Sequence, residues 1–120
     1  MSGLVESSAD ARSKTIGQNY RVRTWMNFDG MGTITLKASG NITATSSITH
    51  NSTGNWTIAF STSLPDENYS VVAMIEPSAS NNGTDTFSSS GNSNASQVNI
   101  QHYEDGTVRD SNTVCVIIVR

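Results

Sequence analysis

The sequence predicts an all-β protein: a single antiparallel β-sandwich or jelly-roll-like domain of seven or eight short strands with an extended N-terminal arm. Two features of the composition favour strands. Leucine occurs only three times, whereas valine, isoleucine and threonine together account for 32 of the 120 residues. The third observation is an alternation of apolar and polar residues that recurs between turn signals from Tyr20 onward.

The alternating segments predict the strands in order along the chain. They cover Tyr20–Phe28, Ile34–Ala38, a weaker segment at Ile42–Ile48, Trp56–Phe60, Tyr69–Ile75, a short segment near Thr84–Ser88, Val98–His102 and Asn112–Val119. Turn signals rich in Gly, Asn, Asp and Pro separate most of them, at Asp29–Gly32, Ser39–Asn41, His50–Asn55, Leu64–Asn68 and Glu104–Asp110. The Ser/Asn/Gly-rich stretch Pro77–Ser96 is expected to form a long exposed loop crossed by the short strand.

The first 18 residues differ from the rest, because they are polar and lack alternation. We therefore expect two parts, an N-terminal arm at residues 1–18 and a β-sandwich domain at residues 19–120. An arm of this kind becomes ordered when it binds a partner. Its candidate docking residues are Leu4, Val5, Arg12 and Ile16.

The last expected strand is apolar on both of its faces. One face carries Val114, Val116 and Ile118, and the other carries Cys115, Ile117 and Val119. A two-layer sandwich covers one face with its core, so either an additional loop or a neighbouring subunit has to cover the other. We favour the subunit, and the candidate interface residues are Val114, Val116, Ile117, Ile118 and Val119.

The sequence contains no arrangement of residues that predicts catalysis. His50 and His102 lie on different segments, and each is interpreted as a surface or strand-edge polar group. No nucleophile motif, metal-binding motif or phosphate loop is present, and Cys115 is the single cysteine. A net charge of −3 without a basic cluster argues against nucleic acid as a partner. The longest apolar run, Val114–Val119, is too short to span a bilayer. We therefore expect no enzyme, cofactor, metal or membrane insertion.

Surface recognition remains as a function that such a domain can perform. Trp25 shares a strand face with two arginines and is the better candidate for an exposed or interface aromatic residue. Trp56 alternates with apolar residues and is interpreted as core. The candidate recognition residues are Trp25, Asn82, Asp85, Phe87 and Tyr103.

The first half of the chain resembles a known module. Residues 23–41 read RTWMNFDGMGTITLKASGN, which is similar to "WVNFNGTGTV…IRASGNV". Residues 48–60 read ITHNSTGNWTIAF and resemble "ITDNGTGDYTVNF", and residues 64–71 read LPDENYSV and resemble "MPDANYSV". These segments recur in tail fibres and other structural proteins of tailed bacteriophages, including phages of marine bacteria and cyanobacteria. The resemblance covers residues 17–76 well and the terminal strand loosely, and it implies a β-rich virion module without enzymatic activity.

The resemblance leads us to expect a non-enzymatic virion structural protein of a tailed phage. It would be a tail fibre or tail-appendage subunit that serves assembly and host-surface contact. The expected partners are other virion proteins, further copies of the chain (a trimer if fibre symmetry applies) and a host-surface glycan. The expected location is the virion, assembled in the host cytoplasm. Two alternatives remain open: a capsid decoration (cement) protein that stabilises the head, and a carbohydrate-binding module.

Overall fold

A computed structural model describes residues 22–76, 85–89 and 92–120, and it confirms the all-β class. The candidate docking residues of the arm and Asn82 lie outside these ranges. The described elements are β1 (Val22–Asp29), β2 (Thr35–Gly40), the 3-10 turn η1 (Thr45–Ser47), β3 (Ile48–Ser52), β4 (Asn55–Ala59), β5 (Ser70–Ile75), β6 (Asp85–Ser89), β7 (Gln97–Glu104), β8 (Thr107–Val108) and β9 (Val114–Val119). No helix in this part of the chain is long and apolar enough to cross a membrane.

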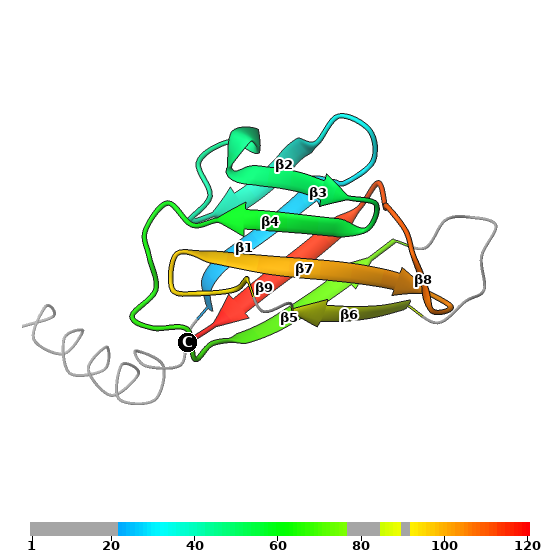
Figure 1. The fold of residues 1–120 in the computed structure, drawn as a ribbon. Helices are drawn as coiled ribbons and strands as arrows, with labels where there is room; N and C mark the ends of the chain where they lie inside the picture. The colour runs from blue at the N-terminus through cyan, green and yellow to red at the C-terminus, as the bar shows by residue number, and fades with distance from the viewer. Residues whose placement is uncertain (1–21, 77–84, 90–91) are drawn as a thin grey trace, which may run out of the picture.

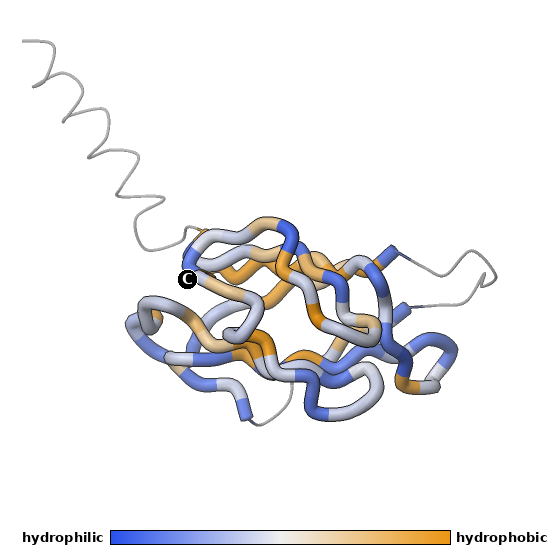
Figure 2. Tube along the Cα trace, turned by 90° about the horizontal axis from the view of Figure 1, so that it is seen from above, coloured by the Kyte–Doolittle hydropathy of each residue, from blue (hydrophilic) through white to orange (hydrophobic). Residues whose placement is uncertain are grey.

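The strands form two antiparallel sheets that pack against each other. Sheet A has the order β2-β1-β9-β5, and sheet B has the order β3-β4-β7-β6, with β8 paired to β7. In Figure 1 the strands of sheet A cross behind those of sheet B at an angle, and Figure 2 shows the two layers edge-on. The sandwich therefore has one inner space and two outer sheet faces.

The core lies between the sheets and is centred on Trp56 of β4. The Trp56 side chain is fully buried, and its ring meets Phe28 edge-on with ring centroids 5.8 Å apart. The interpretation of Trp56 as core is confirmed. The other buried apolar residues are Met26, Phe28, Ile42, Ile48, Ile58, Phe60, Leu64, Val98, Ile100, Val114, Val116 and Ile118.

Three of the expected interface residues belong to this core. Val114, Val116 and Ile118 are essentially inaccessible to solvent because they face sheet B. Their assignment to a subunit interface is therefore wrong. Of the five candidates in β9, only Ile117 and Val119 lie on the outer face.

The number of strands also differs from the expectation. The weaker strand expected at Ile42–Ile48 is wrong, because a 3-10 turn at Thr45–Ser47 interrupts it and β3 begins only at Ile48. The segment His50–Asn55, expected as a loop, is mostly strand, and its turn has only Thr53 and Gly54. Together with the two-residue β8, these changes give nine strands within the described residues.

Gly54 allows the tight turn between β3 and β4. Its φ of +68° is unfavourable for residues with a side chain, and a Cβ would lie 2.8 Å from the backbone nitrogen of Arg109. The Gly54 carbonyl accepts a hydrogen bond from the His102 N–H at 2.8 Å. The Gly54 N–H donates to Asp110 at 2.7 Å. The turn is thereby fixed against β7 and the segment that follows β8.

Candidate functional site

The outer face of sheet A is an exposed apolar surface, which we call the apolar face. Trp25 of β1 pairs in register with Ile117 of β9, which pairs in turn with Val72 of β5. Their exposed fractions are 43%, 43% and 54%, and Met74 on β5 reaches 67%. Val22 is exposed at one end of the same face, where it pairs with Val119. Single exposed apolar residues are ordinary, but a contiguous set marks an association surface.

Trp25 is held in place by a close approach to β2. A Cβ built on Gly40 would lie only 2.4 Å from Trp25 Nε1, so the indole lies directly against this glycine. Gly40 and Trp25 are register partners in the β1–β2 pair. The absence of a side chain at position 40 therefore allows the indole to lie flat on sheet A.

Polar and charged residues border the apolar face at both ends. At one end the Lys37 ammonium donates to the Asn112 carbonyl at 2.9 Å, and Thr113 donates to Glu76 at 2.9 Å. At the other end Arg23 Nε donates to the Arg120 carbonyl at 2.8 Å. A hydrophobic centre within a polar rim is the usual anatomy of a protein interface.

The expected recognition residues do not share one surface. Trp25 lies on the apolar face of sheet A, whereas Tyr103 lies half-buried on the outer face of sheet B. Asp85 and Phe87 lie on the inner side of β6. The Asp85 carboxylate meets His102 Nε2 at 3.1 Å, and the Phe87 ring packs on the His102 ring at 5.3 Å. These two side chains therefore stabilise the end of sheet B instead of facing outward.

His102 is buried, and its interpretation as a strand-edge surface group is wrong. Only 1% of the residue is exposed, because β6 and the segment after β8 cover it. Its Nδ1 lies 2.7 Å from the Arg109 carbonyl, which can only accept, so this nitrogen donates. His50 is more exposed and pairs with Asp110 at 2.9 Å.

The nearby carboxylates are paired in the same way. Asp85 pairs with His102, and Asp110 pairs with His50. The Glu104 carboxylate contacts the Arg109 guanidinium at 3.2 Å. Among the described residues no group of three His, Cys, Asp or Glu side chains is placed to hold a metal ion. These contacts join β6, β7 and the segment after β8, so they stabilise the fold.

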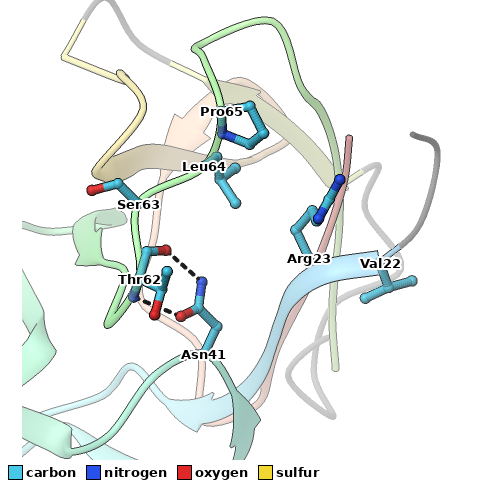
Figure 3. A pocket seen from close by; sticks show the side chains of 7 residues that line it. All are labelled: Val22, Arg23, Asn41, Thr62, Ser63, Leu64 and Pro65. Atoms are coloured by element: carbon cyan, nitrogen blue, oxygen red, sulfur yellow. Dashed lines mark hydrogen bonds between the residues drawn. The ribbon is translucent and has the colours of Figure 1, made fainter. Parts of the chain in front are cut away.

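A pocket of about 290 Å³ lies near the first described residues, and no feature of the sequence predicted it. Three separate segments build it, and its lining residues are Val22, Arg23, Asn41, Thr62, Ser63, Leu64 and Pro65. In Figure 3 the Asn41 amide and the Thr62 backbone bond each other through two hydrogen bonds of 2.8 and 2.7 Å. Both the nitrogen and the oxygen of the Asn41 side-chain amide are therefore already hydrogen-bonded within the protein.

An ion pair near this pocket joins the Leu64–Asn68 turn to the end of β9. Arg120 donates to both oxygens of Asp66, at 2.9 and 2.6 Å. These bonds, with a further one from the Asn68 N–H, lower the pKa of Asp66 from 3.8 to about 2. The pair is solvent-exposed, so its effect on stability is modest.

We expect acid to weaken this connection within a defined range of pH. A carboxylate with a lowered pKa stabilises the folded state above its ordinary pKa of 3.8, and this contribution disappears as the pH falls to about 2. The free energy of unfolding of the Asp66→Asn variant should therefore depend less on pH between about 4 and 2. Urea unfolding at several pH values measures this difference. Equal pH dependence in both proteins would contradict it.

Val72 and Met74 complete the apolar face, although they were not among the expected interface residues. The sequence did contain a signal for them, because β5, like β9, is apolar on alternate residues of both faces.

Comparison of the chain with protein-family models, with curated proteins and with solved structures found no match.

Proposed function

We propose that this protein is a non-enzymatic virion structural protein of a tailed phage, a subunit of a tail fibre or tail appendage. The observation that carries the proposal is the apolar face of sheet A, where Trp25, Ile117 and Val72 form one exposed row across three strands. A face of this kind serves assembly. The resemblance of residues 17–76 to phage virion modules supports the same function.

In this proposal each part of the chain has its own task. The apolar face joins the subunit to its neighbours in the virion. Residues 1–18 dock to another virion protein, and the binding energy of that contact offsets the entropy lost when an arm becomes ordered. The outer face of sheet B and the loops beside it are then available for contact with the host surface.

Immunogold electron microscopy of intact virions with an antibody against this chain tests the proposal. Gold on the tail or its fibres is the expected result, and binding to host cells would be the next assay. Gold distributed over the head would favour a capsid decoration protein, and the thermal stability of capsids would then be measured. Virions that carry no label, although the epitopes are accessible, would overturn the proposal.

The outer face of sheet B favours a second candidate function, a carbohydrate-binding module. The described strands give this face hydroxyl and amide side chains and no charged residue: Thr49, Asn51, Asn55, Thr57, Thr86, Ser88, Gln97, Asn99, Gln101 and Tyr103, with the apolar Ala59 and Val108. Asn99 donates to Asn55 and Thr57 at 3.0 and 2.9 Å, and Asn51 donates to both of these residues. The amides are therefore preorganised on the same sheet face that carries the partly exposed Tyr103.

A panel of neutral polysaccharides tests this candidate. Retention of the protein on one of them, and loss of retention in the Tyr103→Ala variant, would support carbohydrate binding. The Trp25→Ala variant is the matched control, because Trp25 lies on the opposite sheet. If no polysaccharide in the panel retains the protein, the candidate is rejected.

A further inference from the structure

We propose that the apolar face of sheet A binds the same face of a second copy of this chain. The protein would then be a two-fold symmetric dimer in which two A sheets pack face to face. The inference rests on the proposed function only in assigning this face to assembly. It names the partner and the symmetry, which the proposed function leaves open.

The area of the face fits a dimer of standard size. Five large apolar side chains are each exposed by about half, and they are Val22, Trp25, Val72, Met74 and Ile117. Together they offer on the order of a few hundred Å² of apolar surface. A standard interface buries about 800 Å² on each partner, of which about 65% is apolar in homodimers. The face therefore supplies a substantial part of the apolar area that such a dimer needs.

In the sequence outside the described ranges, large apolar side chains are either absent or scattered among polar residues. Residues 77–84 and 90–91 contain no aliphatic residue larger than alanine and proline, no methionine and no aromatic residue. Residues 1–21 contain few large apolar side chains among mostly polar ones: Met1, Leu4, Val5, Ile16 and Tyr20. A second copy, in contrast, presents a matching set of apolar side chains on one sheet surface.

The pairing of one face with itself determines the symmetry. Two sheets that pack face to face keep their strands within about 30° of each other and lie about 10 Å apart. One face that pairs with itself is fully covered after two copies, so the assembly closes as a dimer. A three-fold ring requires two different complementary surfaces on each copy. The trimer expected from fibre symmetry is therefore not the assembly that this face favours.

The dimer has a consequence for the outer surfaces of the assembly. The four sheets would be stacked in the order B, A, A, B, so that both polar, charge-free faces of sheet B point away from the interface. The charged rim residues Lys37 and Glu76 at one end, and Arg23 and Arg120 at the other, would remain at the edge of the contact. The expected assembly thus has an apolar centre and a polar exterior.

Sedimentation equilibrium of the full chain tests the proposal. The wild-type protein is expected to have twice the chain mass of 12.8 kDa. The Ile117→Asp variant should raise the dissociation constant of the dimer by a factor of about 100 or more, because each copy would bury an unpaired carboxylate. Since aspartate in a central strand can prevent folding, Met74→Lys on the edge strand β5 serves as a second variant. Circular dichroism establishes that each variant is folded.

The matched control is Ala59→Asp, which places the same charge on the exposed outer face of sheet B and should leave the dimer intact. A wild-type protein with the mass of one chain or of three chains would overturn the proposal. It would also fail if folded Ile117→Asp and Met74→Lys variants both kept the mass of two chains. If the protein is a monomer and the fluorescence of Trp25 is already that of a buried indole, residues 1–21 of the same chain would be identified as the segment that covers the face. Labelling of virions tests the proposed function separately, because a dimer in solution requires no virion.

Discussion

The Trp56→Ala variant is expected to lose about 3–5 kcal/mol of its free energy of unfolding. Trp56 is fully buried at the centre of the sandwich, between the edge-on ring of Phe28 and the stacked ring of His50 at 6.1 Å. The space around it is tightly filled, since a Cβ on Gly30 would lie 2.7 Å from the indole. Alanine would therefore leave a large cavity that the surrounding strands cannot close. Small domains are stable by only about 5–15 kcal/mol, so the variant should be close to unfolding.

The second tryptophan provides the control. Trp25 lies on the apolar face with 43% of its surface exposed, and the Trp25→Ala variant should lose about 1 kcal/mol or less. Both substitutions are best made in the Met74→Lys background, so that association does not contribute to stability. Urea unfolding followed by circular dichroism gives the two free energies. A greater loss from Trp25→Ala than from Trp56→Ala would contradict this description of the core.

The fold class followed from the sequence because period-two alternation is a local property. In β1 the alternation placed Val22, Thr24, Met26 and Phe28 on one face, and the last three do face inward. Val22 lies on the outer face instead, because the register shifts between Val22 and Thr24. The signal is strong there because the alternating segment is long and an Asp-Gly turn follows it. The incorrect prediction of a strand at Ile42–Ile48 has a local cause as well. Ala44, Thr45, Ser46 and Ser47 carry too little apolar surface to keep the chain extended, and the 3-10 turn replaces the strand.

The candidate site, the apolar face of sheet A, depends on pairing between strands that are distant in the sequence, and alternation does not reveal that pairing. The sequence showed that both faces of β9 are apolar, but it could not tell which face meets sheet B. That choice follows from the pairing of β9 with both β1 and β5, which also brings Val72 and Met74 beside Ile117. The pocket lined by Val22, Asn41 and Leu64 was missed for the same reason, since three distant segments form it.

The burial of His102 is a further long-range effect, and it leads to the second large prediction. The His102→Ala variant is expected to lose about 3–5 kcal/mol of its free energy of unfolding. The substitution removes a buried ring and leaves the Arg109 carbonyl and the Asp85 carboxylate without their histidine partner. The Phe87 ring loses its packing partner as well. Because these contacts join β6 and the segment after β8 to β7, amide hydrogen exchange should increase most in β6.

The more exposed histidine is the control for this prediction. His50 pairs with Asp110 at the surface, and the His50→Ala variant should lose only about 1 kcal/mol. Asp85→Asn retains a side-chain group of the same shape that can hydrogen-bond with His102 Nε2, so it should cost about 1–2 kcal/mol, less than the loss of the ring. A double-mutant cycle of His102→Ala and Asp85→Ala measures the coupling between the two side chains. A coupling energy near zero would mean that packing alone makes His102 important, and that the contact with Asp85 does not hold β6 in place.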